Sequence, residues 1–245
     1  MTDKFFLNYL DDREKIIRKK LADYENSNYI VGMKPLEDLK ESECLEGNYT
    51  IVNIQFSSFF IEHSSDENNK KIFNLFTILL NEIISLLEIN SGLLADYSFK
   101  HVVCVFGIDY KEKMNPIVNG IKFALNLMLL LDERFIPSLN EKKIVDFTSI
   151  QVKIGIAHGQ TYIEKLKNML AQSIIIYGNA YLLASKLSNN AKWREVALAG
   201  NVVNSISEGK TSYIAILSPE EKDWPENSAL IKFYNPSIGQ KVADF

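Results

Sequence analysis

The sequence has few of the residues on which several common classes of protein depend. Its 245 residues include only two cysteines. Two are too few for a disulfide framework, and such a low number is typical of a reducing compartment. Basic residues are not in excess either, because 27 Lys and Arg face 31 Asp and Glu, for a net charge of −4. We therefore expect no nucleic-acid partner.

Long apolar runs are also missing. The N-terminal sequence MTDKFFLNYLDDREK has acidic residues where a secretory signal would be apolar. The two most apolar helix candidates, 72–87 and 117–131, are interrupted by polar side chains, and in the second these recur at helical spacing to form one polar stripe. These segments are typical of buried helices, so we expect no membrane span and a cytoplasmic location.

What is present is a regular alternation of strand and helix patterns from residue 48 onward. Residues 1–26 have helical periodicity, compatible with a helix that packs on its own domain or with one that dimerises, and residues 27–47 read as a linker. We therefore divide the chain into an N-terminal helix and linker, 1–47, and one domain, 48–245. The expected strands are 49–56, 93–99, 101–106, 150–156, 196–199, 213–217 and 230–233, and the expected helices are 69–88, 116–131, 179–187 and 202–206. This order predicts an α+β fold.

Four motifs lie in order within that domain. They are IVNIQFSS at 51–58, DYSFK at 96–100 followed by CVFG at 104–107, KIGIAHG at 153–159, and GNAYLLASKL at 178–187. Together they resemble the catalytic domain of class III adenylate and guanylate cyclases, where the counterparts read FADIxGFT, KxxGDxxxAxFG, RxGIxxG and GDxVNxAARL. The resemblance covers about two thirds of the chain. It implies the class III nucleotidyl cyclase fold, a ferredoxin-like βαββαβ core sheet with helices on one face.

The positions that match the family's two metal-binding aspartates are Asn53 and Lys100. An amide offers one neutral oxygen, which is a weak ligand for a hard cation. An ammonium group repels the cation, and at ~4 Å with an effective dielectric of about 20 this repulsion costs several kcal/mol. We therefore expect no metal ion at this site and no cofactor.

The remaining functional positions of the family also carry other residue types. The base-selecting pair falls on Asp96 and Ile175, and the ribose-binding asparagine falls on Leu182. The arginine that contacts the transition state falls on Lys186, which keeps a positive charge without the bidentate guanidinium. We interpret all six as vestigial pocket positions and expect no catalytic residue.

The sequence thus favours a catalytically inactive cyclase-homology domain. It would be a regulatory or protein-interaction module in signalling, acting through a homodimer or a heterodimer with another cyclase-like chain. On this interpretation the chain is not an enzyme and does not bind nucleotide. Two alternatives stay open. One is a nucleotide-binding sensor, in which Lys100 and Lys186 hold a triphosphate without metal; the other is an active nucleotidyl cyclase, ATP to cyclic AMP, with atypical residues.

Three further features carry smaller expectations. Residues 161–170 contain no glycine where cyclases have a mobile arm, so this stretch should be stiff and is a candidate for a short helix. His63, His101 and His158 have no partner at metal-ligand spacing, and His101 is expected to be exposed or hydrogen-bonded. Cys104 lies in an apolar run and is expected to be buried.

Overall fold

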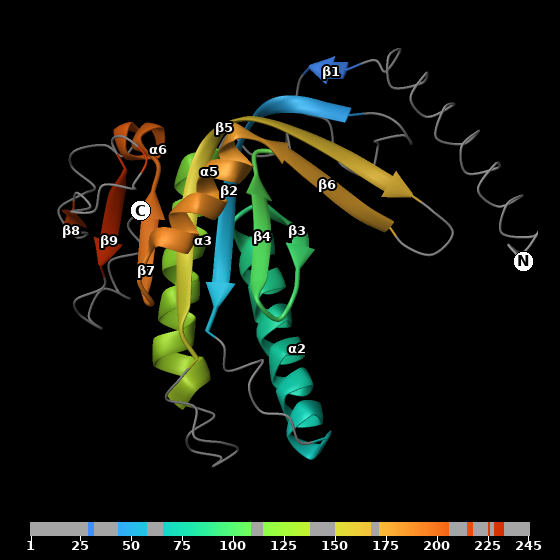
Figure 1. Ribbon diagram of the computed structural model, residues 1–245, viewed down its shortest axis with the longest axis vertical. Coiled ribbons are helices and arrows are strands. Elements are labelled where there is room, and N and C mark those ends of the chain that lie inside the picture. Colours follow the sequence, from blue (N-terminus) through green and yellow to red (C-terminus); the bar gives the residue numbers. More distant parts are fainter. Residues whose placement is uncertain are drawn as a thin grey trace, which may run out of the picture.

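A computed structural model describes residues 29–31, 44–57, 66–108, 115–137, 150–167, 172–205, 215–217, 225 and 228–232. In these ranges the chain forms one twisted sheet with helices packed against it (Figure 1). No helix within them is long and apolar enough to cross a membrane. The predicted N-terminal helix and His63 lie outside the described residues.

The core of the sheet has the predicted βαββαβ order. Its elements are β2 (Cys44–Phe56), α2 (Asp66–Ile89), β3 (Gly92–Tyr97), β4 (His101–Phe106), α3 (Pro116–Leu130) and β5 (Val152–Lys167). The four strands lie in the order β3-β4-β2-β5, and all neighbours are antiparallel. This is the ferredoxin-like arrangement, so the predicted fold class is confirmed.

Further strands extend the sheet on both sides. They are β1 (Tyr29–Val31), β6 (Gln172–Gly178), β7 (Glu195–Leu198), β8 (Ala215–Leu217) and β9 (Ala229–Lys232), with α5 (Asn179–Asn190) and α6 (Gly200–Asn204) between them and a π-helical turn (Leu131–Phe135) after α3. β1 pairs in parallel with β2, so part of the expected linker is strand instead. The division of the chain at residue 47 stays a prediction.

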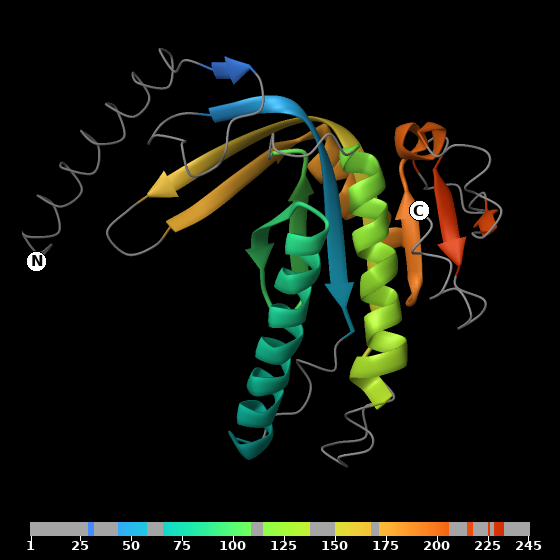
Figure 2. The same cartoon turned by 180° about the vertical axis from the view of Figure 1, so that it is seen from behind.

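Helices cover both faces of the core sheet. In α3, a Cβ on Gly120 would lie 3.0 Å from Thr50 Cγ2 and 3.3 Å from Val52 Cγ2, so these two β2 side chains face α3. Successive strand residues point to opposite faces, and Asn53 therefore faces the other side, where α5 packs. Figures 1 and 2 show α5 on one side of the sheet, and α2 and α3 on the other. The two helices of the βαββαβ core share one face, as expected, and α5 lies on the opposite face.

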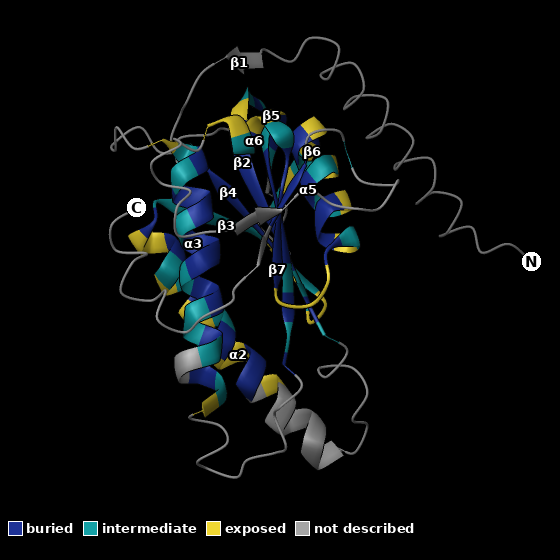
Figure 3. Ribbon diagram, turned by 90° about the vertical axis from the view of Figure 1, so that its left-hand side faces the viewer, coloured by how far each residue is buried: buried dark blue, intermediate teal, exposed yellow. Residues whose placement is uncertain are grey.

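The hydrophobic core lies on both faces of the sheet, against α2 and α3 on one side and α5 on the other, where strand and helix residues are mostly buried (Figure 3). Phe106 and Phe123 join β4 to α3, with ring centroids 5.5 Å apart. α3 begins where the sequence indicated, because Asn115 caps it through a hydrogen bond from Ile117 N and Pro116 occupies the first turn. Cys104 is fully buried, as expected, and this burial raises the pKa of its thiol.

The segment after Gly159 differs from the sequence-based expectation. It forms no short helix before residue 168; β5 continues to Lys167 and pairs with β6 along one edge, while the first residues of β2 pair with its other edge as far as Glu164. These strands form an arm that extends from the core of the sheet (Figure 1). Two glycines stand at the base of this arm, Gly159 with φ 154° and Gly178 with φ 141°. β-branched and aromatic pairs such as Ile163 opposite Ile176 favour the hairpin. The sequence signal for a strand is weak in this stretch, because apolar and polar residues do not alternate strictly along it.

We predict that Gly155→Ala destabilises the fold by about 3 kcal/mol. A Cβ at this position would lie 2.1 Å from the carbonyl oxygen of Ala184 and 2.5 Å from the amide nitrogen of Ser188, both backbone atoms of α5. Urea denaturation followed by circular dichroism measures the loss. Gly120→Ala is the matched control. Its new methyl meets only side-chain atoms at 3.0 Å or more, and equal losses in both variants would show that close helix packing at Gly155 is not the cause.

Candidate functional site

Asn53 is the centre of the candidate site, and it is buried beneath α5. Its side chain is 4% exposed, and its Oδ1 accepts a hydrogen bond from Ser188 Oγ at 3.2 Å. Across the sheet, Asn53 stands opposite Val103 of β4, which in turn stands opposite Asp96 of β3. Since neighbouring strands are about 4.8 Å apart, the Asp96 backbone lies about 10 Å from that of Asn53.

Asp96 belongs to a hydrogen-bonded cluster in the β3–β4 turn. Its Oδ2 lies 3.0 Å from His101 Nε2, and His101 Nδ1 lies 3.0 Å from Ser98 Oγ. Ser98 Oγ also accepts the backbone N–H groups of Lys100 and His101, each at 3.2 Å. His101 is thus hydrogen-bonded, as expected from the sequence. Hydrogen bonds of Ser98 and His101 stabilise the turn on both sides of Lys100.

Lys100 is exposed at the end of β2 where Asn53 lies. Its carbonyl oxygen accepts a hydrogen bond from Phe56 N at 2.9 Å, three residues beyond Asn53. The structure therefore places Lys100, in the β3–β4 turn, beside the end of β2, the strand that carries the other predicted metal-ligand position. The side chain of Asn53 is buried, whereas that of Lys100 is exposed to solvent.

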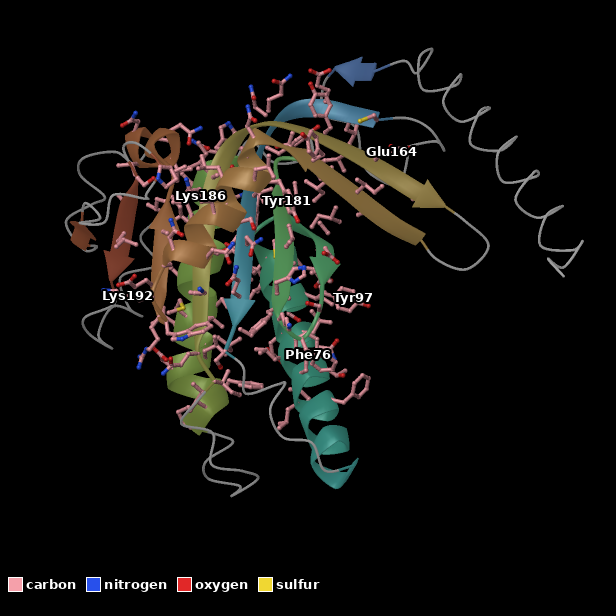
Figure 4. All side chains as sticks on the ribbon, in the orientation of Figure 1. Phe76, Tyr97, Glu164, Tyr181, Lys186 and Lys192 are labelled. Carbon is pink, nitrogen blue, oxygen red and sulfur yellow. The ribbon has the colours of Figure 1, made fainter. Side chains whose placement is uncertain are left out.

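Leu182 and Lys186 are exposed on α5, one helical turn apart, so they share the face that points away from the sheet. Figure 4 shows Lys186 and Tyr181 on this helix, with Lys192 beyond its end. Ile175 lies elsewhere, on arm strand β6 opposite Glu164, and is 45% exposed. Of the six predicted positions, Asn53 is on β2, Asp96 on β3 with β4 between them, Lys100 in the β3–β4 turn, Leu182 and Lys186 on the covering helix, and Ile175 on the arm.

Sequence reasoning missed the side chains that hold α5 in place. Gln55 Nε2 donates to Ser188 Oγ at 3.1 Å and to Asn189 Oδ1 at 2.6 Å. Lys153 Nζ donates to the carbonyl oxygen of Asn189 at 2.9 Å and lies 5.1 Å from the centroid of the Trp193 ring. Partial burial lowers the pKa of the Lys153 ammonium group. We name these contacts, together with the Asn53–Ser188 bond, the α5 clamp. The sequence signal that could have indicated these contacts is two-residue alternation. It puts Asn53 and Gln55 on one face of β2, and Lys153 and Gly155 on one face of β5.

The donor set does not fit a divalent cation. The amide oxygen of Asn53 is already bonded to Ser188, and the second position presents the ammonium group of Lys100. In the part of the chain that the structure describes, no three His, Cys, Asp or Glu side chains gather to form a metal site. An amide already engaged in a hydrogen bond and an ammonium group are poor ligands for Mg²⁺.

Two other titratable groups lie away from this face. His158 Nδ1 is 3.0 Å from Thr50 Oγ1, on the α3 side of β2, and burial lowers the pKa of its imidazole. Cys44 stands at the start of β2 opposite Glu164, and its thiol pKa is raised by burial and by the charge of that carboxylate. Neither group is in contact with the α5 clamp.

The family comparison decides what these elements are. The family described as the adenylate and guanylate cyclase catalytic domain matches residues 55–217. The chain belongs to this family. Its recognition from four motifs is therefore confirmed. A search of the curated proteins finds no significant match.

Solved cyclase structures share the fold at low sequence identity. The adenylyl cyclase CyaB from P. aeruginosa is 14% identical, with a TM-score of 0.63, and the match covers 79% of this chain and 97% of that one. The non-canonical dimeric guanylyl cyclase domain of the RhoGC fusion protein from the aquatic fungus Blastocladiella emersonii is 13% identical, with a TM-score of 0.61 and coverage of 79% and 97%. A class III adenylyl cyclase-like ATP-binding protein from Pseudomonas aeruginosa is 14% identical, with a TM-score of 0.62 and coverage of 80% and 44%.

These findings overturn the expectation that the chain is not an enzyme. The matching family is one of catalytic domains, and among the matching structures are adenylyl and guanylyl cyclases, so the comparisons favour a cyclase. The prediction was wrong because it considered the electrostatics of the metal ligands alone. Replacing two aspartates excludes those two carboxylates as ligands, but it does not exclude other groups that stabilise a triphosphate.

We predict that Ser188→Ala destabilises the protein by about 1–3 kcal/mol, because the buried oxygen of Asn53 loses its donor. Thermal and urea denaturation measure the change. Ser185→Ala, on the same helix, leaves the bond to Asn53 intact and should cost less than about 0.5 kcal/mol. An equal cost for the two variants would contradict a role for the Asn53–Ser188 bond.

Proposed function

We propose that this chain is a nucleotidyl cyclase domain that converts a purine nucleoside triphosphate to the cyclic monophosphate. In this reaction the ribose 3′-oxygen bonds to the α-phosphorus and loses its proton to solvent. The bond from the α-phosphorus to the bridging oxygen breaks, and pyrophosphate leaves with the electron pair. Between ATP and GTP we infer that ATP is the substrate, as in the active-cyclase alternative that the sequence left open.

The observation that carries this proposal is the family match over residues 55–217, which includes α2, β3, β4, α3, β5, β6 and α5 but only the last two residues of β2. The geometry supports it at one residue in particular. Lys186 is exposed on α5, at the position that matches the arginine of the family, and an ammonium group can bind phosphate as a point charge. The α5 clamp fixes the helix that presents this group.

We further infer that the domain works as a dimer, either with a second copy or with another cyclase-like chain. The arm and α5 expose three large apolar side chains, Ile175 at 45%, Tyr177 at 63% and Leu182 at 52%. Exposed apolar groups near one another favour contact with a partner. A guanylyl cyclase domain of the same fold is described as dimeric. A cytoplasmic location, where ATP and GTP are available, remains part of this proposal.

The test of the activity is the formation of cyclic nucleotide. Purified protein is incubated with ATP or GTP, with and without Mg²⁺ or Mn²⁺, and the product is quantified by mass spectrometry. We expect a cyclic product, and we expect Lys186→Glu to lower kcat/KM by about 10²-fold or more, the usual cost of a lost transition-state donor. Lys192→Glu is the matched control, with the same charge change just beyond α5, and should keep the activity. No product under any of these conditions would reject the proposal.

The dimer has its own test. Tyr177→Asp places a charge on the exposed arm and should weaken self-association about tenfold or more, measured by sedimentation velocity across a range of concentrations. Ile78→Asp is the control, because Ile78 is 50% exposed and lies in the middle of α2, which is not part of the arm. Equal association of both variants would contradict an interface on the arm.

A nucleotide-binding sensor is the second candidate function. The match to a class III adenylyl cyclase-like ATP-binding protein favours it, and so do the lysines at positions 100 and 186. Calorimetry with ATP and GTP, read together with the assay for cyclic product, separates the two candidate functions. Binding without cyclic product would favour the sensor, whereas product formation would favour the cyclase.

A further inference from the structure

A serine, a histidine and an aspartate meet in the β3–β4 turn. His101 Nδ1 lies 3.0 Å from Ser98 Oγ, and His101 Nε2 lies 3.0 Å from Asp96 Oδ2. The imidazole thus connects a hydroxyl group to a carboxylate through its two ring nitrogens. Serine, histidine and aspartate linked in this order form the catalytic triad of serine hydrolases, which recurs on unrelated folds and is identified by geometry rather than by sequence position.

The other hydrogen bonds of Ser98 determine where the protons of this cluster lie. Its Oγ accepts the backbone N–H groups of Lys100 and His101, each at 3.2 Å. These two bonds occupy both lone pairs of the oxygen, so the hydroxyl donates its own proton to His101 Nδ1. The neutral imidazole then carries its hydrogen on Nε2 and donates it to Asp96. The two ring nitrogens have exchanged partners relative to the best-known triad, but both hydrogen bonds run in the same direction.

The three side chains are open to a substrate. The side chain of His101 is 37% exposed and that of Asp96 is 60% exposed, and Ser98 is half-buried. A second histidine–hydroxyl pair provides the contrast, because His158 Nδ1 lies 3.0 Å from the Oγ1 of Thr50, which is fully buried. A substrate can therefore reach the hydroxyl in the turn, whereas it cannot reach the buried one.

Aromatic side chains stand beside Ser98. Its chain neighbours Tyr97 and Phe99 are 57% and 36% exposed, and Phe73 of α2 is 57% exposed. The ring centroid of Phe99 lies 4.6 Å from that of Phe76 and 6.3 Å from that of Phe73, so α2 supports this ring. Figure 4 shows Tyr97 and Phe76 at this end of the sheet. An aromatic surface next to a nucleophile favours a substrate with an apolar group.

We propose that Ser98, His101 and Asp96 form an acyl-transfer site that hydrolyses small esters with an apolar acyl group. Ser98 Oγ bonds to the ester carbonyl carbon while its proton passes to His101 Nδ1. The bond from that carbon to the alcohol oxygen breaks, and the alcohol leaves with the electron pair and with the proton from Nδ1. Asp96 stays ionised and stabilises the imidazolium. Water then adds to the acyl carbon through the same base, the carboxylic acid leaves, and Ser98 regains its proton.

The turn also supplies positive groups for the oxyanion that forms during this attack. The oxyanion develops beside Ser98 Oγ, close to the backbone N–H groups of Lys100 and His101 that point at this oxygen. The side chain of Lys100 is exposed and adds a positive charge to the turn. Two backbone bonds fix these groups before a substrate binds, from Ser98 N to the His101 carbonyl at 2.7 Å and from Phe56 N to the Lys100 carbonyl at 2.9 Å. This activity is separate from the proposed cyclase function, and its test uses no nucleotide.

Incubation of the full chain with p-nitrophenyl butyrate tests the proposal. We expect a burst of about one equivalent of p-nitrophenolate per chain, followed by slower turnover. Peptide mapping by mass spectrometry should locate the butyryl group on Ser98, and a fluorophosphonate probe should label the same residue. A chain that gives no burst and no label on Ser98 would overturn the proposal. Acylation of lysines alone would overturn it too, because it reports aminolysis by surface amines.

Variants identify the groups that carry the reaction. Ser98→Ala should abolish the burst and the label. His101→Gln keeps the Ser98 hydroxyl and should slow acylation about 10²-fold or more, the usual contribution of a general base. Asp96→Asn should slow it as well, because an amide does not stabilise the imidazolium. Circular dichroism checks that each variant is folded, and a folded His101→Gln variant that acylates at the unmodified rate would contradict the role of the imidazole.

Two matched controls separate this site from ordinary surface reactivity. Ser205→Ala removes a serine whose hydroxyl donates to the carbonyl oxygen of Asn201 at 2.9 Å instead of to a histidine. His158→Gln removes the imidazole that contacts the buried Thr50. Both variants should keep the burst and the label on Ser98. A loss of acylation in these controls equal to that in Ser98→Ala and His101→Gln would show that the turn is not the reactive site.

Discussion

The close approach of α5 to the sheet at Gly155 determines the rest of the candidate site. Because this residue has no side chain, the backbone of α5 can lie very close to it. A Cβ at this position would be 2.1 Å from the Ala184 carbonyl oxygen and 2.5 Å from the Ser188 nitrogen. Only at this separation can Ser188 reach Asn53 while Gln55 and Lys153 reach Asn189. The position of Lys186 on the outer face of α5 follows from these contacts.

The two positions predicted to match the family's metal-binding aspartates carry an amide, Asn53, and an ammonium group, Lys100. Asn53 now accepts a hydrogen bond in a helix–sheet contact, and Lys100 stands in a turn tied together by Ser98 and His101. Membership in the cyclase family indicates the class of reaction. How the phosphates of a nucleotide are held is a separate question. Amides are neutral and ammonium groups are positive, so they interact with phosphates differently from negatively charged carboxylates.

The arm shows how backbone freedom and side-chain exposure act together. Gly159 and Gly178 have φ values that other residues rarely adopt, and they stand where the arm of β5 and β6 begins, with β2 still paired to β5 as far as Glu164. Ile175 and Tyr177 are exposed on this hairpin, and Leu182 is exposed on the helix that follows it. An apolar surface of this kind is stable in water when a partner covers it, which agrees with the dimer that we infer.

The sequence by itself determined the βαββαβ order and most element positions, because hydrophobic periodicity and turn residues such as Asn115-Pro116 are local signals. Its resemblance to four motifs indicated the family. That Asn53 and Lys100 stand at two changed ligand positions stays a prediction from the sequence. Only the tertiary structure decided that Asn53 is bonded to Ser188, 135 residues away, and that β5 continues into an arm. It also placed α5 on the face opposite α2 and α3. Such facts depend on which distant strands and helices meet, and no local pattern in one chain specifies those contacts.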